Sequence, residues 1–386
     1  MSSRPNFSQS NIILWVLGLL FLFVLVASLA WRIHSGAYPD KAYDEQLIAQ
    51  PEEMTDPGSA YIEAGILVNN IYNFEASQKT FDADGWVWLT WPSDVDRAMK
   101  QHGVLPKDVF YFFNQINGYD ALLIAADLAP KQTPDGRHYA KFQFSGHFFS
   151  NKLDFRKFPF QTLNFPLALE LHTPKRLGLD HPVTLKVDHQ NSGLGAYVDL
   201  GGYITKGFKL GKYKHTYESS LGDPYLDSEP RTVSQLRMEV FYQKNPMVSV
   251  FKILVPMIAV TLISLLSASI TPLNTEVRLS IPPTAILSLI FLQKIYQDWL
   301  PELPYITFLD TIYNLCYLAN LILFGLYLWG SNTLSRAPKD QRFSVAEQIA
   351  KYDSRVQRWL MLAFILAIPG NWFGIGLVER LVTHSA

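Results

Sequence analysis

Between residues 276 and 310 the chain reads EVRLSIPPTAILSLIFLQKIYQDWLPELPYITFLD. Small hydroxyl side chains come first, at Ser280 and Thr284, and large apolar side chains follow, at Leu287 and Phe291. Steps of four, three and four residues place all of them on one face of a helix. A stripe that changes from polar to apolar suits the wall of a water-filled pore that can close. We therefore expect a pore-lining helix, followed by a tight loop over residues 300–305.

Charged residues belong to the same stripe. Glu276 stands one turn before Ser280, Lys294 follows Phe291, and Asp298 follows Lys294 by one more turn. A ring of carboxylates at a narrow mouth attracts cations and repels anions. The alternative for Glu276 is a solvated residue at a helix start, stabilised by the helix dipole. We expect a cation preference set by Glu276, and Lys294 keeps anion selectivity open.

Five apolar segments are each about long enough to cross a bilayer: residues 12–30, 251–270, 279–295, 308–329 and 359–378. The segment 331–358 carries a cluster of basic residues, namely Arg336, Lys339, Arg342, Lys351, Arg355 and Arg358. The positive-inside rule predicts that residues 331–358 are cytoplasmic, so the region before residue 246 lies outside. Residues 1–35 are either a retained membrane anchor or a cleaved secretory signal, with a small-residue site at 28–30. Residues 36–59 are polar and predict a linker.

Short aromatic-rich stretches separated by Gly, Pro, Asn and Asp turns fill residues 60–245. They predict an all-β sandwich, with strands at residues 66–71, 85–91, 139–149, 167–171, 183–187, 197–204 and 234–241. Residues 95–101 interrupt the rhythm and predict a helical insertion. The alternating pattern gives way at residue 246 to a predicted four-helix transmembrane domain, residues 246–386.

The order of these parts resembles the pentameric ligand-gated ion channels, the Cys-loop receptor superfamily, in its prokaryotic branch. Residues 151–162, with Phe158-Pro159-Phe160, look like the signature loop without its two cysteines, and Lys244 stands twelve residues before Pro256. Residues 300–305 and Asp310 are similar to the family's loop between its second and third helices and to the start of the third. Departures are Gln161 after Phe160, Lys244 where the family has Arg, and Pro282-Pro283 inside the pore helix.

The resemblance implies a homopentamer in a bacterial inner membrane, with a periplasmic domain that binds a small ligand or protons. It implies that Phe158, Pro159 and Phe160 press on Pro301, Pro304 and Tyr305, and that Lys244 takes part in this coupling. Tyr213, Tyr217 and Tyr225 look like a loop over a ligand site, where aromatic faces hold a cation. Tyrosines that only pack the loop are an equal alternative. A non-conducting membrane-anchored sensor of the same fold is the alternative for the whole chain.

Composition excludes several other classes. A net charge of −1 over 386 residues gives no reason to expect a nucleic-acid partner. The histidines at positions 147, 172, 181, 189 and 215 show no zinc spacing. The single cysteine, Cys316, lies in an apolar run, and residues 192–195 lack the Lys-Ser/Thr of a phosphate loop. We expect neither enzyme activity, nor a metal, nor a cofactor.

Overall fold

The computed structural model describes residues 47–49, 60–116, 122–150, 153–171, 183–196, 198–217 and 231–384. The chain divides into two compact units. The strand unit comprises residues 38–153 and 162–244, and the helical unit includes residues 154–161 and 245–386. The predicted N-terminal hydrophobic segment lies outside the described residues, as does most of the predicted linker. Within the predicted linker, residues Leu47–Ala49 form strand β1.

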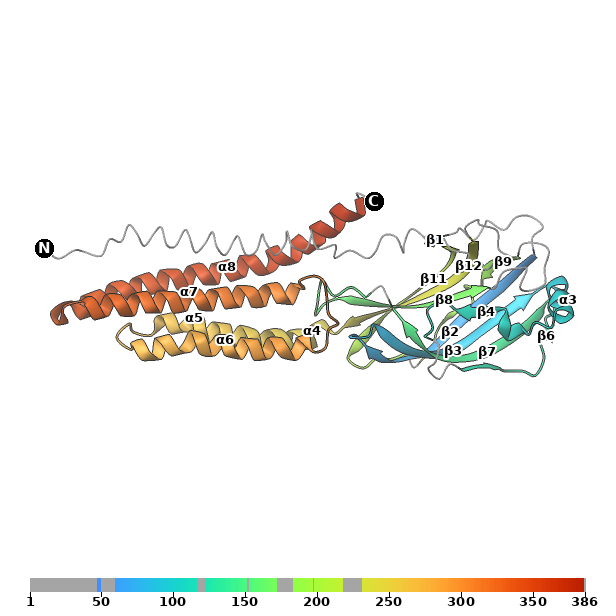
Figure 1. Cartoon of the computed structure of the whole chain (residues 1–386), viewed down its shortest axis with the longest axis horizontal. Coiled ribbons are helices and arrows are strands. Elements are labelled where there is room, and N and C mark those ends of the chain that lie inside the picture. Colours follow the sequence, from blue (N-terminus) through green and yellow to red (C-terminus); the bar gives the residue numbers. More distant parts are fainter. Residues whose placement is uncertain are drawn as a thin grey trace. The chain divides into compact units, whose positions relative to one another are not determined.

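The strand unit contains two sheets (Figure 1). One has the order β1-β11-β12-β8-β4, with β11 at Tyr203–Tyr217, β12 at Arg231–Lys244, β8 at Thr162–Leu171 and β4 at Phe110–Phe112. The other has the order β10-β2-β3-β7-β5, with β10 at Gly193–Leu194, β2 at Ala60–Glu75, β3 at Thr80–Trp91, β7 at His138–Phe149 and β5 at Leu122–Ala125. Strand β6 (Lys131–Gln132) pairs with β7, and β9 (Val183–Val187) pairs with β2.

Alternation along the strands builds the core between these sheets. In β3 every second side chain is buried, as a strand with one covered face requires. Phe112 and Phe165 of the five-stranded sheet meet rings of the other sheet: Phe112 lies 4.9 Å from Phe144, and Phe165 lies 4.9 Å from Phe81, between ring centroids. Such edge-on and tilted aromatic pairs add to the free energy of burial. They join the two sheets into a sandwich-like layer.

The structure confirms the predicted β-rich region followed by helices. The predicted insertion is helix α3 (Ser93–Gln101), followed by the short helix η1 (Pro106–Asp108). The strand predicted at residues 197–204 is displaced, because β11 begins at Tyr203 after a turn at residues 201–202. Gly202 adopts a φ of 82°, which glycine reaches without strain and which suits that turn.

The helical unit has three helices long and apolar enough to cross a membrane, within the described part of the chain. The first spans Pro246–Ser269 and consists of α4 (Pro246–Ser249), the π-helix η3 (Val250–Leu254), α5 (Val255–Leu266) and the short η4 (Ser267–Ser269). The π-turn precedes Pro256, which lacks the N–H that a regular helix would use. The other two are α6 (Thr275–Gln297) and α7 (Phe308–Arg336).

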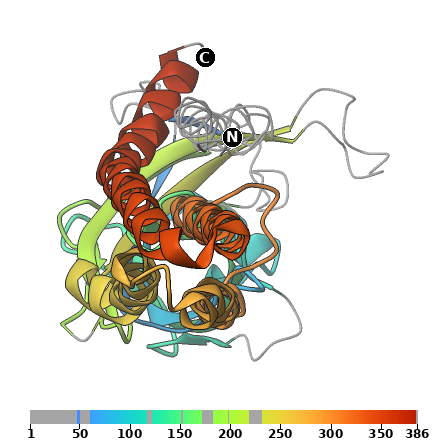
Figure 2. The same ribbon diagram turned by 90° about the vertical axis from the view of Figure 1, so that its left-hand side faces the viewer.

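Helix α8 (Arg342–His384) completes the unit, after the short turn η5 (Lys339–Gln341). It contains the predicted fourth apolar segment, but the described residues do not identify that segment as a span. Figure 2 shows α5, α6 and α7 nearly end-on and α8, in red, at an angle to them. Helix α6 packs against α5 and α7, and α7 packs against α8. The predicted loop at residues 331–358 is mostly helical, because α7 continues to Arg336 and α8 begins at Arg342.

Candidate functional site

Helix α6 presents the whole predicted stripe on its exposed face. The side chains that pack into the unit are Arg278, Pro282, Ala285, Leu289 and Tyr296. The exposed residues include all seven members of the stripe, namely Glu276, Ser280, Thr284, Leu287, Phe291, Lys294 and Asp298. The helix therefore separates a buried face from an exposed side that carries the stripe, and the exposed side also includes Val277, Ile290 and Ile295.

Local hydrogen bonds organise that exposed face. The Ser280 hydroxyl donates to the Val277 carbonyl at 2.9 Å, and the Thr284 hydroxyl donates to the Ser280 carbonyl at 2.8 Å. Pro282 and Pro283 lie inside the continuous helix and remove two backbone N–H donors, so the carbonyls four residues earlier lack their usual partners. The polar third of the stripe thus offers the hydroxyl oxygens of Ser280 and Thr284 on the exposed face.

The charges at the two ends differ in their pairing. Lys294 Nζ lies 2.8 Å from Asp298 Oδ1, one turn further along the exposed face. Glu276 forms no ion pair with any described residue. The stripe as a whole has one unpaired carboxylate near the start of α6 and a neutralised pair near its end. The Lys294 charge is therefore balanced locally.

The buried face of α6 is fixed at the same end as Glu276. The Arg278 guanidinium hydrogen-bonds and forms an ion pair with Asp353 of α8, and both side chains are buried. The guanidinium also lies 4.2 Å from the ring centroid of Tyr327 on α7. The Tyr327 hydroxyl lies 2.7 Å from the hydroxyl of Ser267. These contacts of Arg278 join α6 to α7 and α8.

The predicted coupling loop belongs to the helical unit and packs on its helices. Phe158 is buried and stacks on Tyr296 of α6, with ring centroids 5.7 Å apart. Phe160 contacts Phe308 of α7 at 6.2 Å and Trp372 of α8 at 5.7 Å. The loop thus touches three helices through two aromatic side chains.

Backbone contacts tie the same loop to the segment between α6 and α7. The Phe155 N–H donates to the Tyr305 hydroxyl at 3.2 Å, and the Phe308 N–H donates to the Arg156 carbonyl at 2.8 Å. Pro301 is buried and Pro304 is exposed in this segment. The loop thus contacts residues 301–305 through Tyr305, and Phe158 contacts α6 through Tyr296.

The start of α7 completes this arrangement. Thr307 and Asp310 form a capping box, in which Asp310 Oδ2 accepts from the Thr307 N–H at 2.9 Å. The Tyr296 hydroxyl donates to the other Asp310 oxygen. Asp310 thus links Tyr296, the residue on which Phe158 stacks, to the first turn of α7. Lys244, the remaining predicted coupling residue, is the last residue of β12 and pairs with Tyr203 of β11.

The predicted ligand tyrosines fall on a strand rather than in a loop. Tyr213 and Tyr217 lie on β11, opposite Gln235 and Arg231 of β12. Tyr225 lies outside the described residues. The Tyr217 hydroxyl donates to Glu170 Oε2 at 2.6 Å, so this ring belongs to a polar cluster inside the strand unit.

Glu170 is the centre of that cluster, and the sequence analysis missed it. Its Oε1 atom accepts from Gln235 at 2.7 Å and contacts His215 Nδ1 at 2.6 Å, and its Oε2 atom accepts from Tyr111 at 2.5 Å. Burial raises the pKa of the Glu170 carboxyl, but the hydrogen bonds from His215, Tyr111 and Tyr217 outweigh it and leave the pKa below its ordinary value. A lone acid inside the apolar run at residues 167–171 was the signal available in the sequence.

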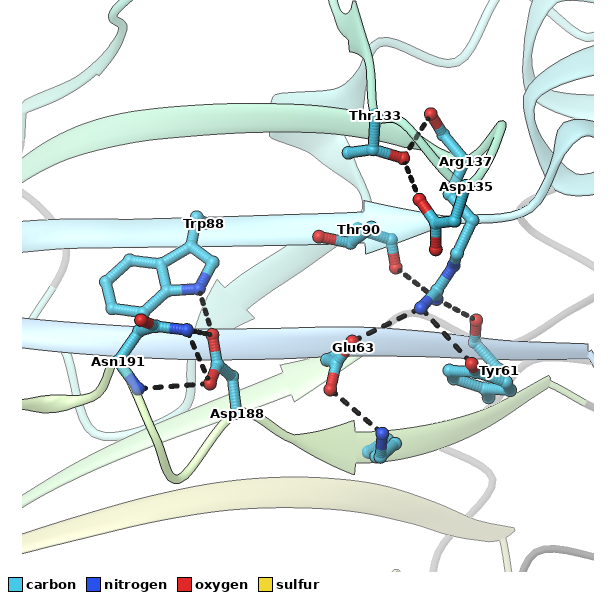
Figure 3. A network of polar contacts seen from close by, with 10 residues as sticks. Tyr61, Glu63, Trp88, Thr90, Thr133, Asp135, Arg137, Asp188 and Asn191 are labelled. Carbon is cyan, nitrogen blue, oxygen red and sulfur yellow. Dashed lines mark hydrogen bonds and ion pairs between the residues drawn. The ribbon is translucent and has the colours of Figure 1, made fainter.

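A second polar network covers part of the seven-stranded sheet (Figure 3). Arg137 donates to the carbonyls of Tyr61 and Thr90 at 3.2 and 3.0 Å and to Glu63 at 3.2 Å. Asp188 accepts from the Trp88 indole at 3.0 Å and from the Asn191 amide. These donors are satisfied within the fold, so the network ties β2, β3 and β9 together and leaves little capacity for a ligand.

No group of three or more His, Cys, Asp or Glu side chains in the described part of the chain could hold a metal ion. No protein-family model matches the chain, and no curated protein matches its sequence. The arguments for function therefore rest on the geometry of these residues.

Proposed function

We propose that this chain forms a homopentameric, cation-selective ion channel of a bacterial inner membrane, opened by a ligand or protons that act on a periplasmic strand unit. One observation carries the proposal. A helix with the length and hydropathy of a membrane span exposes Glu276, Ser280, Thr284, Lys294 and Asp298 on one face.

That face is unsuited to lipid. Charged side chains within a membrane segment are costly and normally face a bundle interior or a water-filled cavity. One chain buries the opposite face of α6 against α5 and α7, so only further copies of the chain can enclose the exposed stripe. Five copies are what the resemblance implies. Each would contribute one α6 to the wall of a central pore.

The order of side chains along the stripe supports a closable, cation-preferring pore. Leu287 and Phe291 are 54% and 63% exposed in the single chain, and rings of such side chains would exclude water from a narrow pore. Glu276 would supply five carboxylates at one mouth. Lys294 is paired with Asp298, which reduces its opposition to cations.

The loop at residues 154–161 supports a route from the strand unit to the pore helix. It is bounded on both sides by strands of the sandwich, yet it packs on α6, α7 and α8. A movement of β7 and β8 would be transmitted to the ring of Tyr296, which lies on α6 two residues after Lys294 of the stripe. The alternative is a membrane-anchored sensor of the same fold. Such a sensor would make the same contacts at this loop but would conduct no ions.

Current measurement separates the two functions. The full chain would be purified, incorporated into a planar bilayer, and recorded across a salt gradient while pH and candidate ligands are varied. The channel proposal predicts discrete unitary currents from an oligomer whose mass is five times the chain mass of 43.9 kDa. A pentamer that stays silent under every condition, including in a Leu287→Ser variant, would favour the sensor.

A further inference from the structure

A hollow lies on the face of the five-stranded sheet that points away from the aromatic core. Strand pairing places Phe113, Ala168, Arg237 and Gly211 in one row across β4, β8, β12 and β11. The rows on either side carry larger side chains, such as Glu170, Gln235 and Tyr213 in one and Pro166, Glu239 and Lys209 in the other. Because Ala168 is small, the row leaves space next to Arg237.

This space is a pocket of about 250 Å³. Its walls are mainly aromatic and aliphatic, and its lining residues are Phe113, Asn114, Gln115, Ile116, Phe149, Pro166, Ala168 and Arg237. The volume lies below the roughly 300–1,000 Å³ that is usual for drug-sized ligands. A ligand of this pocket would be small and largely apolar, with one group that meets Arg237.

Arg237 is a buried cation with unused donors. Its side chain is 3% exposed, and its Nε lies 3.0 Å from Glu239 Oε1 on the same strand. This contact is an ion pair without hydrogen-bond geometry, so the Arg237 Nε is a buried donor with no hydrogen-bond partner among the described residues. By contrast, Arg137 on the other sheet donates from both terminal nitrogens to Tyr61, Glu63 and Thr90. Burying an unsatisfied charged group is costly, so the Arg237 donors need an acceptor.

The other polar groups of the lining narrow the choice of acceptor. The Asn114 amide is occupied, because its Nδ2 donates to the carbonyls of Phe149 and Pro166 and its Oδ1 accepts from the Ala168 N–H. Only Arg237 and the Gln115 amide remain to recognise a polar group. A planar pair of N–H donors matches the two oxygens of a carboxylate.

We propose that this pocket binds a small aromatic monocarboxylate, with its carboxylate on the guanidinium of Arg237 and its ring between Phe113 and Phe149. Glu239 forms an ion pair with the guanidinium and leaves the Nε donor without a hydrogen bond. The pocket adjoins the Glu170 cluster through Phe113, whose ring centroid lies 4.8 Å from that of His215. Benzoate binding is measured at equilibrium and requires no current. The binding proposal therefore does not rest on the proposed channel function, and either proposal can fail without the other.

The test uses the purified full chain in detergent, with sodium benzoate as the probe and benzamide as its neutral analogue. Titration calorimetry and saturation-transfer NMR should detect saturable benzoate binding. The affinity for benzamide should be lower by a factor of about ten or more, because benzamide lacks the charge-assisted pair of hydrogen bonds. Absence of saturable benzoate binding, including the case in which a neighbouring copy fills the pocket, would overturn the proposal.

Two variants locate the site by independent means. Ala168→Leu fills the hollow without changing charge, and the double variant Arg237→Gln/Glu239→Gln removes the cation without leaving its carboxylate partner alone. Each should weaken benzoate binding about tenfold or more. Lys209→Gln, which removes an exposed cation from the adjacent row, is the matched control and should bind benzoate as the wild type does. Unchanged affinity in both pocket variants, or an equal loss in the control, would contradict the assignment.

Discussion

At the scale of single residues, Glu170 illustrates how a buried carboxylate is kept ionised. The carboxylate is fully buried, and desolvation alone would favour its neutral form. Partners on three strands supply hydrogen bonds to both oxygens: Tyr111 on β4, His215 and Tyr217 on β11, and Gln235 on β12. The depressed pKa of Glu170 follows from these donors. The charged carboxylate therefore adds side-chain hydrogen bonds that join β8 to β4, β11 and β12.

The first prediction concerns this charge. Glu170→Gln should lower the free energy of unfolding by at least about 2 kcal/mol near neutral pH, since hydrogen bonds to a charged group are lost. A carboxyl with a depressed folded pKa contributes stability above its unfolded pKa of about 4.3, and that contribution disappears as the pH falls through the folded pKa. The difference between wild type and variant should shrink below about pH 4 in denaturant unfolding monitored by fluorescence.

Glu75→Gln provides the control for that experiment, because Glu75 is exposed at the end of β2. It should change stability by less than about 0.5 kcal/mol at any pH. A Glu170→Gln difference that stays constant from pH 7 to pH 3 would contradict the proposed role of the carboxylate charge.

The second prediction concerns the apolar part of the stripe. Leu287→Ser should raise the open probability of the channel, because a hydroxyl at this ring makes the constriction easier to wet. Ile290→Ser is the matched control, since Ile290 is also exposed on α6 but lies off the stripe. Single-channel recording of both variants checks the prediction. An open probability that is unchanged or lower in Leu287→Ser would argue against a hydrophobic gate.

At the scale of elements, the sequence was informative wherever a periodic pattern was strong. The 4-3-4 spacing in residues 276–298 predicted one face of α6, and all seven stripe residues are exposed on it. The alternating stretches predicted most strands, although β2, β11 and β12 extend well beyond their predicted segments. The placement of Tyr213 and Tyr217 in a loop was wrong, because the aromatic residues continue the alternation of β11.

Contacts between residues far apart in the chain could not be predicted from a periodic pattern in the sequence. The pairing of Arg278 with Asp353 joins residues 75 positions apart, and the Glu170 cluster draws on four strands. Such partners depend on which elements pack together, and residue spacing along one element carries no information about that. The resemblance indicated the loop at residues 151–162, but the ring of Tyr296 as the partner of Phe158 emerged only from the structure.

The third prediction tests that partner. Phe158→Ala should destabilise the protein by about 3–5 kcal/mol, as expected for a buried Phe, and Tyr296→Ala should be destabilising as well. Because the rings stack, the double variant should be less destabilised than the sum of the single variants by about 0.5–1.5 kcal/mol. Thermal unfolding of the three variants provides the measurement. Phe160→Ala combined with Tyr296→Ala is the control pair, and additivity in both cycles would contradict a direct Phe158–Tyr296 coupling.

At the scale of the whole molecule, the account requires a defined orientation in the membrane. The fourth prediction is that the connection between α7 and α8 lies in the cytoplasm, because the basic residues around it follow the positive-inside rule. Residues 339–341 are exposed there, so a reporter inserted at that turn should be tolerated. An alkaline phosphatase inserted at residue 340 should be inactive and a fluorescent protein bright. The opposite pattern would reverse the assignment of the outside.

The final prediction concerns the selectivity of the assembled pore. Five copies of Glu276 would concentrate negative charge at one mouth, whereas each Lys294 is paired with Asp298. The pore should therefore prefer cations, and Glu276→Gln should lose most of that preference. Lys294→Gln is the control and should leave the cation preference intact.

The most direct test of the channel proposal is the reversal potential of the current through a bilayer that separates two concentrations of the same salt. The account predicts unitary currents that reverse near the cation equilibrium potential for the wild type and close to zero for Glu276→Gln. Absence of current, or a wild-type reversal near the chloride potential, would contradict it.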